Sequence, residues 1–385
     1  MAARAERFPS WLLALGPLVL IAVLVVLFVR LDPIGSLREV PPVEAVAIER
    51  TELDEGMVTL EVRNDGPDPV TIAQVLVDDA YWQHEITDRE LGRLETATIR
   101  IPYPWDDGTP LNIALVTSTG LTIEHEIEVA AVTPEVDAAT LATYALLGIY
   151  IGVVPVAVGL LWLPSLRRAR RRWIVFFLAF TVGLLAFLLV DTIEEGLELA
   201  AAAASSLNGL GLFAFGALLA VVGLMTLERS LAARRGALPG LALSYLIAAG
   251  IGLHNLGEGL AVGAALAAGE VALGTFLIVG FALHNTTEGL AIVAPLGDAD
   301  RPLLKHLVAL GALAGVPTIA GAWAGGFAFS PAWAALAFGV AAGAIAQVVW
   351  AVTRSLSSDG GLTTVNAAVG FLSGVVVMYA TGLLA

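Results

Sequence analysis

The chain has 385 residues, of which 57% are hydrophobic and 14% are charged, and its formal net charge is -15 at pH 7. This composition is too apolar for a soluble globular protein and is typical of a polytopic membrane protein, whose spans must cross about 30 Å of hydrocarbon. The acidic excess gives no support to nucleic acid as a partner. The chain has no cysteine, so any bound metal must use nitrogen and oxygen ligands rather than thiolates.

The first element in chain order is an apolar run at residues 11–29, with Arg4 and Arg7 before it and Arg30 after it. A cleaved signal peptide would need a shorter apolar core and a small-residue cleavage site, and neither is evident here. We therefore expect residues 1–32 to hold a short cytoplasmic start and an uncleaved transmembrane anchor.

Residues 43–134 differ from the rest of the chain, because apolar and polar residues alternate there with a period of two. The runs at 58–62, 71–75 and 121–127 show this pattern, and turn-forming residues such as those at 64–69 separate the runs. About seven short strands over about ninety residues predict a small immunoglobulin-like β-sandwich. We expect this domain on the extracellular side.

From residue 141 onward, eight apolar runs are long enough to span a bilayer as helices. All eleven Lys and Arg residues of this region fall in alternate connections, which the positive-inside rule places in the cytoplasm. The β-domain and the C-terminus would then lie outside the plasma membrane, and the N-terminus inside. The predicted spans are 141–163, 174–198, 208–227, 239–266, 270–296, 303–326, 332–353 and 363–384.

The fourth and fifth predicted spans carry nearly the same polar pattern, His-Asn-x-x-Glu-Gly, thirty residues apart. In each pattern the His and the Glu stand four residues apart, which places both on one face of a helix. Ionisable side chains at mid-membrane depth are costly, and no Lys or Arg is expected there to neutralise the carboxylates. The two patterns contain His254, Asn255, Glu258 and Gly259, and His284, Asn285, Glu288 and Gly289.

A divalent cation would supply the missing positive charge. Two imidazoles and two carboxylates suit Zn²⁺ and also Fe²⁺, Mn²⁺, Co²⁺ or Cd²⁺. The alternative is structural: each His and Asn would hydrogen-bond between packed helices, and both Glu side chains would be protonated. One pattern alone would fit either account equally well, whereas two patterns with matching spacing favour a metal site.

The chain resembles the ZIP (Zrt/Irt-like) family of divalent metal transporters, closest to its bacterial branch. The resemblance is carried by the two patterns and by their position in the fourth and fifth of eight spans. The outward termini of the eight-span region and the basic connection after its first span agree with it. The resemblance covers residues 141–385 and leaves the anchor and the β-domain as an added module. It implies an eight-helix bundle that moves metal inward as its substrate. By matching position, the primary ligands would be His254, Glu258, His284 and Glu288, and Asn255 and Asn285 would join the two Glu residues at a second ion.

The chain departs from the family pattern in lacking acidic residues at two places and in having Gly257 and Thr287 where the family usually has Pro inside the patterns. The sixth span often supplies an acidic residue to the second metal, but residues 314–319 contain no carboxylate and Thr318 is a poor substitute. The seventh span commonly carries an acidic pair, whereas this chain has Gln347 in that region. We therefore expect one well-formed metal site, with a second site that is weak or absent.

An acidic stripe lies near the outer end of the second predicted span, where Asp191, Glu194, Glu195 and Glu198 recur at helical spacing. We interpret the stripe as an entrance that concentrates cations, with Asp191 as the member that reaches the pathway. The alternative is an exposed helix end in the interfacial layer.

We expect a transporter and not an enzyme, with zinc as the favoured ion. An intramembrane zinc hydrolase would need the order His-Glu-x-x-His, which is absent from the patterns. A membrane metal sensor or binding protein without flux stays open as an alternative, because the extracellular domain could respond to bound metal. Small residues at Gly339, Gly343 and Ala346 could allow two chains to associate as a homodimer.

Overall fold

The structure, a computed structural model, divides into two compact units, Met1–Val43 and Glu44–Ala385. In the first unit, helix α1 (Ser10–Leu31) has 22 residues and carries Pro17. At 1.5 Å per residue it is about 33 Å long. The expected anchor is therefore helical, and its place in a membrane stays a prediction. The structure describes residues 10–31, 42–127, 129–233, 239–267, 271–297, 303–358 and 360–383.

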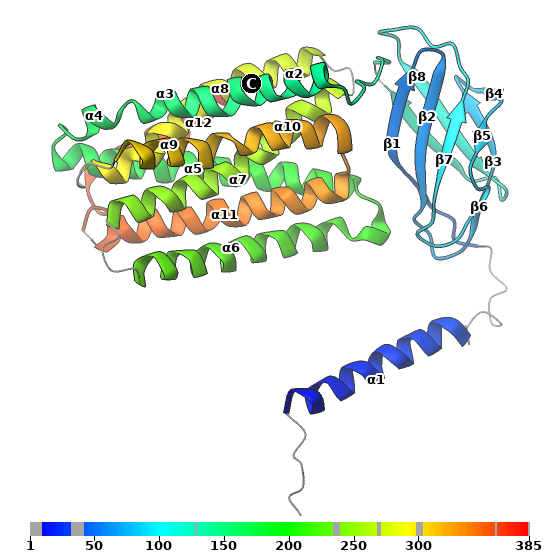
Figure 1. The fold of residues 1–385 in the computed structure, drawn as a ribbon, viewed down its shortest axis with the longest axis horizontal. Coiled ribbons are helices and arrows are strands. Elements are labelled where there is room, and N and C mark those ends of the chain that lie inside the picture. Colours follow the sequence, from blue (N-terminus) through cyan, green and yellow to red (C-terminus); the bar gives the residue numbers. More distant parts are fainter. Residues whose placement is uncertain are drawn as a thin grey trace, which may run out of the picture. The chain divides into compact units, whose positions relative to one another are not determined.

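The β-domain of the second unit is a sandwich-like pair of antiparallel sheets (Figure 1). Its strands are β1 (Val46–Asp54), β2 (Met57–Asn64), β3 (Val70–Val77), β4 (Ala80–Trp82), β5 (Glu85–Ile86), β6 (Glu90–Leu91), β7 (Thr96–Ile101), β8 (Leu111–Thr117) and β9 (Thr122–Ile127). One sheet has the order β1-β2-β7-β5, and the other has β4-β3-β8-β9 with β6 paired to β3. The predicted alternation holds, because Val58, Leu60 and Val62 of β2 are fully buried in the core.

The described residues contain nine strands where about seven were expected. The difference comes from β4, β5 and β6, which are only two or three residues long and too short to show a period of two. The two-sheet arrangement agrees with the prediction, and the immunoglobulin-like topology stays a prediction.

Within the described residues, eight helical segments are long and apolar enough to cross a membrane, the number that the hydropathy pattern predicts. The segments are Ala138–Leu166, Arg171–Ala202, Ser205–Ser230, Gly240–Ala267, Leu273–Leu296, Leu304–Ala328, Pro331–Ser357 and Val365–Gly382. Their elements are α2 (Ala138–Gly148), η2 (Ile149–Val153), α3 (Val154–Leu160), α4 (Leu163–Leu166), α5 (Arg171–Ala202), η3 (Ser205–Leu207), α6 (Gly209–Ala233), α7 (Pro239–Ala267), α8 (Val271–Val293), η4 (Ala294–Leu296), α9 (Leu304–Gly315), α10 (Pro317–Ala328), α11 (Pro331–Ser358) and α12 (Val365–Gly382).

Two of these segments are interrupted by proline. In the first, the π-helical turn η2 precedes α3, and Pro155 has no N–H with which to bond the carbonyl of Ile151, four residues earlier. In the sixth, α9 ends at Gly315 and α10 begins at Pro317, with Val316 between them. Both interruptions lie beside the helices that carry the polar patterns, so backbone carbonyls are available there to side chains of other helices.

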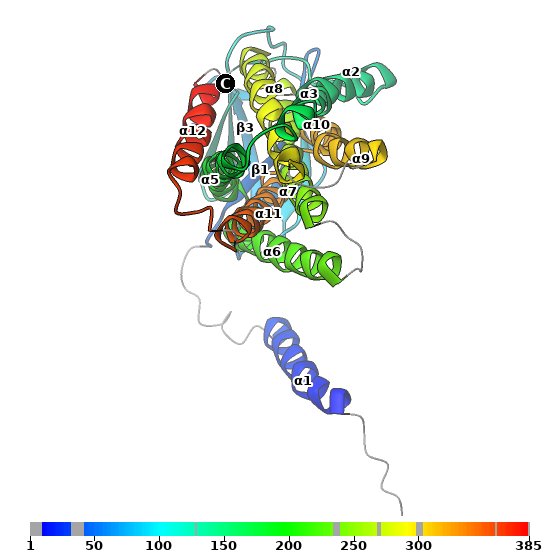
Figure 2. The ribbon, with the colours of Figure 1, turned by 90° about the vertical axis from the view of Figure 1, so that its left-hand side faces the viewer.

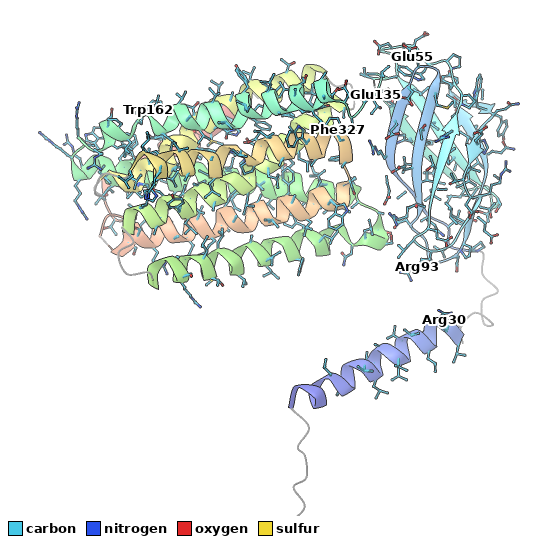
Figure 3. The ribbon with its side chains drawn as sticks, viewed as in Figure 1. Arg30, Glu55, Arg93, Glu135, Trp162 and Phe327 are labelled. Atoms are coloured by element: carbon cyan, nitrogen blue, oxygen red, sulfur yellow. The ribbon has the colours of Figure 1, made fainter. Side chains whose placement is uncertain are left out.

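Helix α7 occupies the middle of the bundle, where it packs against α8, α9, α10 and α11, and α8 packs against α3 (Figure 2). Leu184 and Leu188 of α5 and Ile247 and Ile251 of α7 lie in the buried apolar core. Figure 3 shows the side chains that the elements carry, with charged residues such as Glu55 on the β-domain and apolar ones such as Trp162 on the helical segments. An apolar outer surface is what a bundle immersed in lipid requires.

The small residues Gly339 and Gly343 of α11 pack against another helix of the same chain. A Cβ atom built on Gly339 would lie 2.1 Å from the carbonyl oxygen of Phe213, so only a glycine at this position lets the backbone of α6 pack this closely against α11. Gly343 packs in the same way on Ala217. This face, expected to allow chains to associate, is thus covered by α6, and a homodimer stays a prediction.

Candidate metal centre

The two polar patterns meet in the interior of the bundle. His254 and Glu258 lie on α7 and His284 and Glu288 lie on α8, and one potential ligand atom from each lies within 4.8 Å of the others. All four side chains are buried, and Glu288 is completely so. The four-residue spacing within each pattern and the packing of α7 on α8 therefore bring the four groups into one cluster.

Both imidazoles turn the same nitrogen toward Glu258. The Nε2 atom of His254 lies 3.1 Å from Oε1 of Glu258, and Nε2 of His284 contacts the same oxygen. In a tetrahedral zinc site with bonds of about 2.1 Å, ligand atoms stand roughly 3.4 Å apart. A cluster whose ligand atoms lie within 4.8 Å of one another can reach that geometry through small side-chain movements.

Asn285 holds the other oxygen of Glu258. Its Nδ2 donates to Glu258 Oε2 at 2.8 Å and to the carbonyl of Ile151 at 3.0 Å, the carbonyl that Pro155 leaves without its helical donor. Because a carbonyl only accepts, the bond to Ile151 fixes the orientation of the amide. Asn285 thereby positions Glu258 through its nitrogen.

Asn255 is anchored in a similar way, since its Nδ2 donates to the carbonyl of Ala314 at 3.1 Å, near the break at Pro317. The Oδ1 atoms of Asn255 and Asn285 are buried and have no hydrogen-bond partner. These oxygens are the atoms with which either amide could bind an ion, and that role stays a prediction.

Glu288 is a buried carboxylate that has neither a hydrogen bond of normal geometry nor a basic side chain to stabilise it. Both of its carboxylate oxygens are buried; the Asn255 amide lies near enough to interact with them, but no hydrogen bond of normal geometry forms, and no Lys or Arg of the described residues pairs with Glu288 or with Glu258. A carboxylate in this state costs several kcal/mol. A bound cation would remove that cost, which makes the chemistry of Glu288 fit a metal site.

The glycine that ends each polar pattern permits a close helix contact. A Cβ atom on Gly259 would lie 2.1 Å from the carbonyl oxygen of Thr318 in α10, and one on Gly289 would lie 2.3 Å from that of Val156 in α3. The two glycines thus let α7 and α8 approach the helices that carry the interruptions. This packing explains why the repeated pattern extends one residue beyond its Glu.

The acidic stripe of α5 extends away from the cluster. Asp191 lies close enough to His254, His284 and Glu258 to interact with them electrostatically, whereas Glu195 interacts with Glu258 and with Glu198. Asp191 and Glu198 are exposed in the protein and Glu195 is half-buried. Both residues therefore lie within electrostatic range of Glu258, and the entrance function of the stripe stays a prediction.

Thr318 and Gln347, at the positions where acidic residues were expected from the family pattern, have different surroundings. Thr318 is fully buried and its hydroxyl has no hydrogen-bond partner. Gln347 is also buried, but its Nε2 donates to Glu228 of α6 at 3.0 Å, and Glu228 pairs with Arg354. Gln347 thus joins an ion-pair cluster between α6 and α11.

One residue in contact with the cluster was missed in the sequence. Thr192 of α5 is fully buried, and its Oγ1 lies 3.1 Å from Nδ1 of His254. No local signal in the sequence marks it, because its contact with His254 depends on how α5 lies against a helix 62 positions away.

Comparison with known proteins adds little to this geometry. No protein-family model matches the chain, and no curated protein matches it. Among solved structures, the chain shows a likeness to the archaellum periplasmic stator protein FlaG from Sulfolobus acidocaldarius, with 14% identity and a TM-score of 0.20. The match covers 22% of this chain and 99% of that chain. A TM-score this low does not establish a shared fold.

Proposed function

We propose that this chain is a divalent metal transporter of the ZIP type, which moves its cation, with zinc favoured, inward across the plasma membrane. The observation that carries the proposal is the unpartnered carboxylate of Glu288 beside Glu258 and two imidazoles, all buried between two helices long enough to cross a membrane. A site buried between such helices can pass an ion across a membrane by opening to each side in turn, as transporters do.

The charges of the cluster suit a doubly charged ion. Two carboxylates and two neutral imidazoles reach zero net charge with one dication, and His254 and His284 present Nε2 from opposite helices. The same groups accept Fe²⁺, Mn²⁺, Co²⁺ and Cd²⁺, so the ion set extends beyond zinc. Asp191 and Glu195 would concentrate the cation on the outer side before it reaches the cluster.

Protons and metal compete for the same nitrogen and oxygen atoms. Binding a cation requires neutral His and ionised Glu side chains, so metal entry displaces protons. Uptake should therefore weaken as the outer solution is acidified. Because Thr318 stands where the family often has a carboxylate and Gln347 is bound to Glu228, we propose one strong ion site and a second that is weak or absent.

The alternative function is a metal sensor or binding protein without flux, and one observation favours it. Asp65, in the turn between β2 and β3, accepts hydrogen bonds from the backbone N–H groups of Ser205 at 2.7 Å and Ser206 at 2.6 Å. These serines follow the acidic end of α5, so a change at the cluster could reach the β-domain through them. An enzymatic function has no such support, and we propose that the chain is not an enzyme.

Zinc flux into vesicles distinguishes the two functions. The purified full chain is reconstituted into liposomes that contain a zinc-sensitive dye, and His284→Gln is compared with His306→Gln. His306 is the matched control, because its Nδ1 pairs with the hydroxyl of Tyr245 at 2.9 Å and it lies outside the cluster. We expect flux in the wild type and in His306→Gln, and none in His284→Gln. Zinc binding without flux in the wild type would establish the sensor instead, and normal flux in His284→Gln would refute the assigned site.

A further inference from the structure

Thr192 supplies a buried hydroxyl to a side chain of the metal centre from a helix that contributes no ligand to it. Its Oγ1 lies 2.7 Å from the carbonyl oxygen of Leu188, four residues earlier on α5, and 3.1 Å from Nδ1 of His254 on α7. The side chain is fully buried. Water therefore cannot reach Thr192 to replace either hydrogen-bond partner.

The hydrogens of this contact can be assigned from the chemistry of the groups. A hydroxyl has one hydrogen to donate and two lone pairs, whereas a peptide carbonyl can only accept. The shorter contact, to Leu188, therefore takes the hydrogen of Thr192. The oxygen of Thr192 is then an acceptor toward His254, so Nδ1 of that ring must carry a hydrogen.

That assignment decides what the other ring nitrogen can do. A neutral imidazole with its hydrogen on Nδ1 has a free lone pair on Nε2. In His254, Nε2 is the atom that faces the cluster, 3.1 Å from Glu258 Oε1. The opposite tautomer would place an N–H there, donating to Glu258 and leaving no lone pair for an ion.

We propose that Thr192 is a positioning residue for metal transport: it selects the tautomer and ring orientation of His254 that leave Nε2 free to bind the cation. The inference depends on the proposed function, since it concerns the same site. It adds that α5 takes part in metal binding through a hydrogen bond and not through a ligand. Removing such an outer partner of a metal-bound histidine typically lowers affinity by about 10- to 100-fold.

A threonine within a helix often bonds to the carbonyl four residues earlier and has no other function. Thr181, on the same helix, is such a residue: it is fully buried and donates to the carbonyl of Phe177 at 2.9 Å. Among the described contacts, Thr192 differs from it by the added bond to His254. Comparing substitutions of Thr181 and Thr192 therefore distinguishes loss of the bond within the helix from loss of the bond to the His254 imidazole.

The experiment measures zinc affinity of the full chain in detergent, by competition with a fluorescent chelator. Thr192→Val replaces the hydroxyl by a methyl group of similar shape and should weaken zinc binding by about 10- to 100-fold. Thr192→Ser restores the acceptor and should bind as the wild type does, and Thr181→Val should also leave affinity unchanged. If the valine variant does not fold to a monodisperse protein, Thr192→Ala gives the same measurement.

A double-mutant cycle with His254→Gln tests whether Thr192 acts through that ring. We expect Thr192→Val to cause no further loss once His254 has been replaced. The inference is overturned if Thr192→Val binds zinc like Thr181→Val, or if it causes the same loss in the presence and absence of His254. A wild-type chain that binds no zinc would overturn the proposed function as well, so the two failures are distinguishable.

Discussion

Replacement of Gly289 by alanine is the sharpest test of how packing holds the metal centre. Gly289 follows Glu288 on α8 and seats the backbone of α3. A Cβ atom at this position would lie 2.3 Å from the carbonyl oxygen of Val156 and 2.8 Å from the Cα atom of Gly159. Both obstacles are backbone atoms, so no side-chain rotation can relieve them. The matched control is Gly223 of α6, where an added Cβ atom meets nothing within 4 Å.

The size of the effect follows from these contacts. The contact with Val156 is 0.7 Å short of the 3.0 Å below which real Cβ contacts essentially do not occur, so α8 must move away from α3 by about that amount. Overpacking of this kind destabilises by about 1–3 kcal/mol. Alanine's higher helix propensity returns about 1 kcal/mol. Metal-ligand distances tolerate only about 0.2 Å, so we expect zinc affinity to fall at least about tenfold, or about 1.4 kcal/mol.

The assay combines thermal unfolding of the purified chain with a zinc titration. Gly223→Ala should raise the unfolding temperature slightly, because it gains propensity without a clash, and should leave zinc affinity unchanged. Gly289→Ala should lose stability and affinity together. Wild-type zinc affinity in Gly289→Ala would show that the approach of α3 to α8 does not hold Glu288 in place, and the packing argument would be refuted.

Two further predictions concern the β-domain contact and the ligand set. Burial raises the pKa of Asp65, but hydrogen bonds from Ser206 and Ser205 outweigh it and hold the pKa below its usual range. Its stabilisation is therefore present above about pH 4 and lost as the pH falls through the lowered pKa. Asp65→Asn should unfold at a lower temperature than the wild type at pH 7, and this difference in unfolding temperature should narrow below about pH 4. The control is Asp107→Asn, since Asp107 is an exposed residue of the same β-domain. An equal difference at both pH values, or a similar effect of Asp107→Asn, would contradict the assignment. Because the chain contains no cysteine, a thiol-alkylating reagent should leave zinc uptake by reconstituted vesicles unchanged, and inhibition would count against a site built from nitrogen and oxygen alone.

Much of this fold could be predicted because its signals are local. The eight apolar segments and the alternating β-domain depend on residue periods within one element, which the chain carries regardless of its partners. The His and Glu of each pattern also share a face by helical geometry alone, so the pairs His254 with Glu258 and His284 with Glu288 could be recognised before the helices were assembled.

The tertiary structure decided which groups those pairs meet. Thr192 reaches His254 across 62 positions of sequence, and Asn285 reaches Ile151 across 134. Neither contact leaves a periodic signal, because each depends on how one helix is rotated and shifted against another. The small residues of α11 illustrate the same limit: their spacing permits close packing, but only assembly determines that α6 of the same chain fills the face. A local pattern specifies which side chains an element presents, and the packing of all the helices together specifies what those side chains touch.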